Sequence, residues 1–198
     1  YSISSAVFAS YFGADLTYLV DDGDFAEKNT EPYLSFIEKK QVNGCNSKKI
    51  RYKYLTNGTK SLKEIPSEST DFIFSNAVLE HVIKSDFKQL LIQTKRIIKK
   101  GGVCSHVIDL KDHLGESLNN LRFSDKFWES KLIHNSGFYT NRLRFPEIIK
   151  MFEDVGFDCD VISIKKFDQL PLRKEKLNNH FSSFSEEELL VSSFHVLL

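Results

Sequence analysis

Hydrophobic positions along the chain follow two alternating patterns. Short apolar runs bounded by Gly, Asn or Asp predict β-strands at about residues 16–20, 50–55, 71–74, 103–110, 159–167 and 192–198. Apolar residues spaced three and four apart predict helices at about residues 2–12, 30–42, 87–98 and 148–155, and a short one capped by Ser185 and Glu188. Such alternation predicts an α/β fold with a mainly parallel sheet and helices on both faces.

The stretch from about residue 111 to residue 143 interrupts this alternation. It is rich in Asn, Ser, Phe and charged residues, and it follows the carboxyl end of a predicted strand. Open α/β sheets bind ligands at that end. We therefore predict one domain over residues 1–198, with a substrate-side insertion at about 111–143.

The balance of charged residues indicates which kinds of binding partner suit the chain. The 27 Lys and Arg balance the 27 Asp and Glu, so no net charge draws the chain to nucleic acid or an anionic membrane, and a small-molecule partner fits better. The 3 cysteines, Cys45, Cys104 and Cys159, form no metal-binding spacing and are interpreted as free thiols of a cytoplasmic protein. No apolar run is long enough to span a membrane, no signal peptide is evident, and nothing indicates an oligomeric state.

Two motifs resemble class I S-adenosylmethionine-dependent methyltransferases. The segment 65–82, IPSESTDFIFSNAVLEHV, is similar to the fourth-strand motif of that family, which ends in Leu-Glu-His-Val. About twenty residues later, segment 97–103, IIKKGGV, resembles the turn from the following helix into the fifth strand. The resemblance implies a Rossmann-like fold with an antiparallel last strand and S-adenosyl-L-methionine as cofactor.

The resemblance also implies which residues contact the cofactor. Asp21 follows the second strand, where the family places the acid that accepts hydrogen bonds from the ribose hydroxyls, and Asp22 is the next candidate. Asn57 follows the third strand, where relatives have an acid near the adenine amine. Ser75, Asn76 and Ala77 would line the methionine half. The plain alternative for Asp21, Asp22 and Asn57 is a solvated turn.

The chain departs from the family in one respect. None of its 9 glycines forms the glycine-rich cofactor loop, and the first residues predict a helix with no strand before it. On the resemblance, the chain begins after that loop and is truncated, so its first strand is missing.

Three side chains are candidates for the chemistry. Methyl transfer to an oxygen or nitrogen benefits from a base, and His81 and His113 are both predicted to follow strands that end at the same sheet edge. Either Asp109 or Asp112 is a candidate to orient His113 and raise its basicity. Local packing of His81 and a charged loop around His113 are the plain alternatives.

The insertion supplies candidate acceptor contacts: Asp112, Arg122, Trp128, Tyr139 and Arg142. Arginines near aromatic residues favour a phosphorylated or carboxylated acceptor, such as a sugar nucleotide, and surface ion pairs are the alternative. No Cys, His, Asp and Glu spacing matches a metal site.

The leading interpretation is methyl transfer to a small molecule, with a sugar or sugar nucleotide as the suggested acceptor. The alternative is a catalytically inactive methyltransferase-like binding or regulatory module, which the absent glycine loop would favour. A nicotinamide-dependent α/β enzyme also uses an acid after its second strand, but it would not account for the two motifs.

Overall fold

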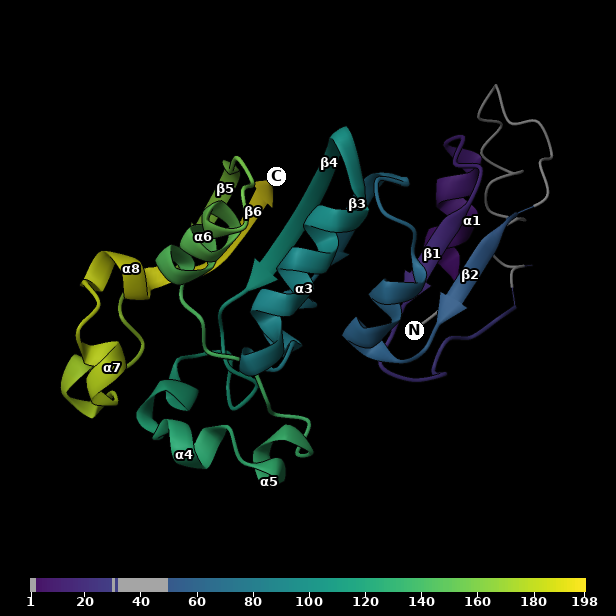
Figure 1. Cartoon of the computed structure of the whole chain (residues 1–198). Coiled ribbons are helices and arrows are strands. Elements are labelled where there is room, and N and C mark those ends of the chain that lie inside the picture. The colour runs from purple at the N-terminus through teal and green to yellow at the C-terminus, as the bar shows by residue number, and fades with distance from the viewer. Residues whose placement is uncertain (1–2, 30, 32–49) are drawn as a thin grey trace. The chain divides into compact units, whose positions relative to one another are not determined.

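The structure is a computed structural model that describes residues 3–29, 31 and 50–198. It separates into two compact units, Tyr1–Pro66 and Ser67–Leu198, called here the first and second units (Figure 1). The helix predicted at about residues 30–42 lies outside the described residues.

The first unit contains a parallel pair of strands. Helix α1 (Ser4–Tyr11) is followed by Gly13, whose φ of +100° supplies the left-handed conformation common after helices. Strand β1 (Thr17–Val20) pairs in parallel with β2 (Tyr52–Leu55), and a 3-10 turn, η1 (Gly58–Glu64), follows β2.

The second unit is built on a four-stranded sheet of order β3-β4-β6-β5. Strand β3 (Thr70–Asn76) runs parallel to β4 (Ile98–Asp109), whereas β6 (Val191–Leu197) is antiparallel to both β4 and β5 (Asp160–Lys166). The predicted α/β fold with parallel strands and an antiparallel last strand is confirmed.

Two amphipathic helices cover one face of this sheet (Figure 1). Helix α3 (Lys84–Ile97) contributes Phe87 and Leu91 to the core, and α6 (Phe145–Asp154) contributes Ile148 and Phe152. These side chains pack with Cys104 and Ile108 of β4 and with Phe194 and Val196 of β6. The alternation of buried residues in β4 and β6 thus follows from one face meeting the helices.

The predicted insertion forms short helical pieces, η3 (Asn119–Arg122), α4 (Asp125–Trp128) and α5 (Lys131–His134). Near the C-terminus lie η4 (Lys174–Lys176), α7 (Asn179–Ser182) and α8 (Glu186–Leu190). A second hydrophobic cluster joins the two segments: Leu118 and Leu121 pack with Leu177, Phe181 and Leu189. The capping box of Ser185 and Glu188 forms as predicted at the start of α8.

The sequence predicted that the paired glycines form the turn at the end of α3, and this prediction was wrong. Helix α3 ends at Ile97, β4 begins at once at Ile98, and Gly101 and Gly102 lie inside β4. There the pairing with β3 jumps from Ile98 opposite Thr70 to Val103 opposite Phe72. Gly101 has a φ of +78°, so the glycines accommodate a bulge in the strand.

Candidate functional site

The candidate residues of the second unit gather at the carboxyl ends of β3 and β4. After β3 the chain turns sharply at Ala77, whose φ is +51°, and the Ala77 N–H donates to Val107 O at 2.9 Å. A single 3-10 turn, η2 (Leu79–His81), follows. Asn141 fixes this turn, because its Nδ2 donates to Leu79 O at 2.8 Å and to Val82 O at 3.1 Å, and its N–H donates to Glu80 O at 2.7 Å.

The structure brings together the two histidines that were predicted as bases. The rings of His81 and His113 meet edge to face, with centroids 4.9 Å apart. His81 Nδ1 lies 3.1 Å from Tyr139 O, and a carbonyl only accepts, so Nδ1 carries the proton and Nε2 keeps its lone pair. Partial burial lowers the pKa of His81, His113 lowers it further, and Asp109 raises it. His81 is therefore neutral at pH 7 and able to accept a proton.

Asp109 does not take the place beside His113 that the sequence suggested. Its Oδ1 accepts from the Lys111 N–H at 2.9 Å, and its Oδ2 lies 3.5 Å from Lys111 Nζ. Its charge nevertheless reaches His81 and Glu80, because it raises the pKa of both.

Sequence reasoning missed Glu80. Its side chain is only 3% exposed, and neither carboxylate oxygen has a hydrogen-bond partner among the described residues. Burial raises the pKa of Glu80 to about 7, helped by the charge of Asp109 and only partly offset by backbone amides. The one sequence signal was its place in the Leu-Glu-His-Val motif.

In the first unit, Asp21 is held at the end of β1. Its N–H donates to Leu55 O at 2.9 Å, and its Oδ1 accepts from the Asp22 N–H at 2.8 Å. The Tyr54 hydroxyl lies 3.1 Å from Asp21 Oδ2. Asp22 and Asn57 are exposed nearby, and a side chain at Gly58, whose φ is +52°, would strike the Asp22 carboxylate.

The three predicted cofactor residues of the second unit differ in position. Ser75 Oγ lies 2.8 Å from His106 Nδ1, and His106 stacks on Phe152 of α6, so Ser75 faces the helix side of the sheet. Asn76 and Ala77 are exposed where β3 ends.

Four of the five predicted acceptor residues are buried and bonded within the protein. Asp112 is 0% exposed, and its carboxylate accepts from the N–H groups of Leu114, Ser117 and Asn119. Trp128 Nε1 donates to Thr140 O at 2.8 Å, and the Tyr139 hydroxyl donates to Glu129 at 2.8 Å. These contacts close the insertion on itself, so we reinterpret the residues as structural.

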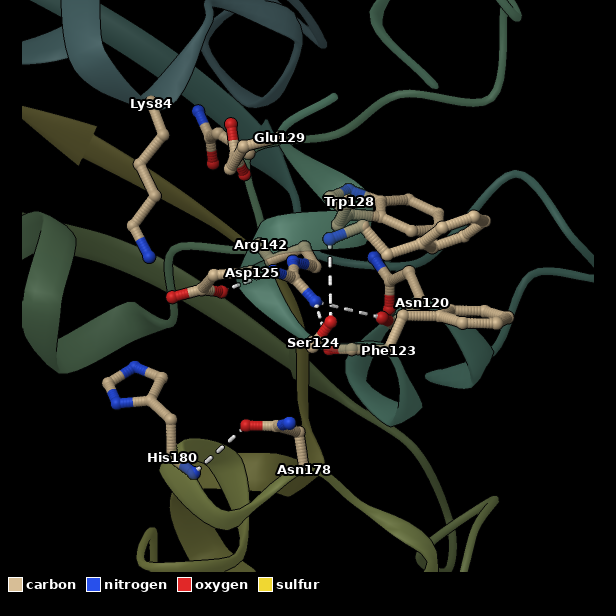
Figure 2. A network of polar contacts seen from close by, with 12 residues as sticks. Lys84, Asn120, Phe123, Ser124, Asp125, Trp128, Glu129, Arg142, Asn178 and His180 are labelled. Atoms are coloured by element: carbon tan, nitrogen blue, oxygen red, sulfur yellow. Dashed lines mark hydrogen bonds and ion pairs between the residues drawn. The ribbon is translucent and has the colours of Figure 1, made fainter. Parts of the chain in front are cut away.

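Arg142, the fourth, lies inside the insertion (Figure 2). Its guanidinium stacks between the rings of Trp128 and Phe181, with centroid distances of 5.4 and 5.1 Å. It donates to Asn120 O at 3.2 Å and Phe123 O at 2.7 Å, and it pairs with Asp125. Only Arg122 of the five is exposed.

Comparison with known proteins supports the motif-based prediction. Residues 13–105 match the family model described as "Methyltransferase domain". No curated protein matches. A solved S-adenosylmethionine dependent methyltransferase from Mesorhizobium loti is 12% identical, with 98% of this chain and 84% of that chain covered and a TM-score of 0.50. A SAM dependent methyltransferase from Archaeoglobus fulgidus is also 12% identical, with 98% and 91% covered and a TM-score of 0.45.

The match covers residues 13–105 of the 198, and the likeness to the Mesorhizobium loti structure is one of fold. That solved protein is named as S-adenosylmethionine dependent. The donor set of the first unit would suit the ribose of such a molecule: a carboxylate offers about four acceptor positions, and the contacts of Asp21 leave room for ribose hydroxyls.

Two searches of the described residues gave negative results. No helix of the described residues is long and apolar enough to cross a membrane. No group of three or more His, Cys, Asp or Glu side chains within residues 3–29, 31 and 50–198 is placed to hold a metal ion.

Proposed function

We propose that this chain is an S-adenosylmethionine-dependent methyltransferase that acts on a small-molecule acceptor, with His81 as the base that removes the acceptor's proton. S-adenosylmethionine supplies an electrophilic methyl group when bound. The free Nε2 lone pair of His81 carries this proposal: Tyr139 O fixes the tautomer, and the lowered pKa keeps the ring neutral at pH 7. His113 lies against His81 and forms the second half of the base site.

We assign the cofactor contacts unit by unit. In the first unit, Asp21 would accept from the ribose hydroxyls, and Asp22 and Asn57 would lie near the adenosine part. In the second unit, Asn76 and Ala77 are exposed at the end of β3 and would face the methionine part. Ser75 is the weakest of the six assignments, since its hydroxyl already meets His106.

Arg122 is the one residue of the original set that is free to reach an acceptor from the surface. A sugar or sugar nucleotide stays a prediction that rests on sequence resemblance. Cytoplasmic location is likewise proposed: Cys104 and Cys159 carry free thiols.

Calorimetric titration with S-adenosylhomocysteine tests the cofactor part. We expect saturable binding to the 198-residue chain and a loss of about 10- to 100-fold in affinity for Asp21→Ala, as expected for hydrogen bonds to a charged group. Asp24→Ala is the matched control, because Asp24 is exposed and pairs with Lys28. Absence of binding, or equal losses in both variants, would contradict the assignment.

A further inference from the structure

Glu80 is a buried carboxylate that has no role in the proposed chemistry. Its carboxylate is 97% buried by exposed area, yet both oxygens lack hydrogen-bond partners among the described residues. A buried polar group without a partner is rare in folded proteins, and it commonly marks a bound molecule or a functional role. The backbone around Glu80 is held by Asn141, which donates to Leu79 O before it and to Val82 O after it.

Glu80 lines a small cavity in the second unit. The cavity volume is about 10 Å³, room for about one water molecule or one ammonium group. Besides Glu80, the cavity wall comes from Asp109, Leu110 and Lys111 at the end of β4 and from the segment 140–143 that includes Asn141.

The groups around the cavity offer more acceptors than donors. The Asn141 amide donates to Leu79 O and Val82 O, and its Oδ1 accepts from the Leu143 N–H. The Arg142 guanidinium donates toward Asn120 O, Phe123 O and Asp125. Lys111 Nζ pairs with Asp109 and Glu116. Among the described residues that line the cavity, the side-chain atoms left without a partner are the Arg142 Nε and both carboxylate oxygens of Glu80. A second carboxylate, Asp109, is close enough to raise the pKa of Glu80.

A molecule that fits here must bring hydrogen-bond donors and, best, a positive charge. An ammonium group has three N–H donors, is close to water in size, and relieves the repulsion between the two carboxylates. The cavity is linked to the base site through two of its lining residues, because Glu80 directly precedes His81 and Asp109 acts electrostatically on both.

We propose that the Glu80 cavity binds the protonated amino group of an amine-bearing methyl acceptor. Glu80 is the primary contact and Asp109 the supporting charge. The inference rests on the proposed function, since it names the chemical class of the acceptor at that site. It also revises the earlier expectation of an anionic acceptor, because Arg142 is enclosed in the insertion.

The test is an NMR titration of the 198-residue chain, labelled at glutamate side-chain carboxyl carbons, with n-propylammonium chloride. We expect saturable binding at pH 8 that moves the Glu80 signal. Because the pKa of Glu80 is about 7, its ionised fraction falls about tenfold between pH 8 and pH 6, and binding should weaken by the same factor. The amine stays protonated throughout. The other titratable or charged groups near the site are His81, His113, Asp109, Lys111 and Arg142.

Variants separate these groups. Glu80→Gln should abolish binding at both pH values. Asp109→Asn should weaken binding, and it serves as the second variant if Glu80→Gln does not fold. Glu153→Gln, an exposed carboxylate on α6, is the matched control and should bind as the wild type does.

Three results would overturn the proposal: no saturation by the amine, saturation that leaves the Glu80 signal unmoved, or equal binding of neutral n-propanol. In each case the cavity holds water alone or the amine binds elsewhere. S-adenosylhomocysteine is titrated into the same samples. Its binding without amine binding refutes this inference alone, whereas failure of S-adenosylhomocysteine to bind refutes the proposed function.

Discussion

Arg142 illustrates how a residue type can suggest one role and its surroundings enforce another. Its φ of +61° is a conformation that costs a non-glycine residue of order 1 kcal/mol. That cost is offset by two backbone carbonyl acceptors, Asp125, and aromatic rings on both faces of the guanidinium. An arginine near aromatic residues in a sequence predicts an anion site, but in this chain the anion is Asp125 of the same insertion.

We therefore expect Arg142→Met to destabilise the second unit by about 2–4 kcal/mol, because it leaves buried carbonyl oxygens without donors. Arg142→Lys should recover little of this, since an ammonium lacks the planar fork. Arg122→Met, at an exposed position, should change stability by less than about 0.5 kcal/mol. Urea denaturation measures all three. A stable Arg142→Met variant with a raised KM would restore the acceptor-binding role.

His81 gives a second prediction at this scale, with signs set by its neighbours. His113 lowers the pKa of His81 and Asp109 raises it. We therefore expect His113→Asn to raise the pKa of His81 and Asp109→Asn to lower it. An NMR titration of the imidazole protons reads both shifts. Lys88→Gln on the exposed side of α3 is the control and should leave the titration unchanged. If the pKa of His81 moved in the same direction in both variants, the described arrangement of His81, His113 and Asp109 would be contradicted.

At the scale of elements, the strand pattern was predictable because its cause is local. Alternating or continuous apolar runs ended by Asn, Asp or Gly predicted all six strands, and the structure has each of them within a few residues. The exception was the junction of α3 and β4. Two glycines after a helix usually end it, but here the helix already ends at Ile97 and the glycines accommodate a bulge that pairing with β3 imposes. A neighbouring strand is not visible in a local pattern.

The positions of candidate residues could be predicted from the sequence only where the order of strands along the chain determines them. His81 and His113 follow parallel neighbouring strands, so their meeting was implied by topology. Burial of Asp112, Trp128, Tyr139 and Arg142 was not, because the insertion packs through contacts specific to its own loops. Glu80 was missed because its burial depends on Asn141, which is distant in sequence. The prediction of a single domain and the cofactor residues stay predictions.

The bulge in β4 gives a prediction at this scale. A Cβ at Gly102 would lie 2.9 Å from the Ile98 side chain and 3.0 Å from Asp71 O, and the second of these is backbone that cannot move cheaply. We expect Gly102→Ala to destabilise the second unit by about 1–3 kcal/mol. Adding Ile98→Val should recover only part, because the clash with Asp71 O remains. Thermal unfolding followed by circular dichroism measures both variants. Unchanged stability of Gly102→Ala would mean that the bulge is not present in solution.

At the scale of the whole second unit, two buried groups make the free energy of unfolding depend on pH. The pKa of His106 lies below its ordinary value, and the pKa of Glu80 lies above its ordinary value. Burial lowers the pKa of His106 from 6.5 to about 4, so the unfolded chain binds this proton first on acidification and stability falls from pH 6.5 down to about 4. Burial raises the pKa of Glu80 from 4.5 to about 7, so the folded chain holds this proton first and stability falls as pH rises from 4.5 to about 7. The two effects oppose each other between about pH 4.5 and 6.5.

Single variants should therefore reveal slopes of opposite sign, each about 1.4 kcal/mol per pH unit relative to the wild type. In Glu80→Gln the His106 effect is unopposed, and stability should fall more steeply on acidification. In His106→Asn the Glu80 effect is unopposed, and stability should rise on acidification relative to the wild type. The double variant should parallel the wild type across this window, which controls for all other titrating groups. Urea denaturation at half-unit pH steps measures the four slopes, and single variants that parallel the wild type would show that neither group is buried in its neutral form.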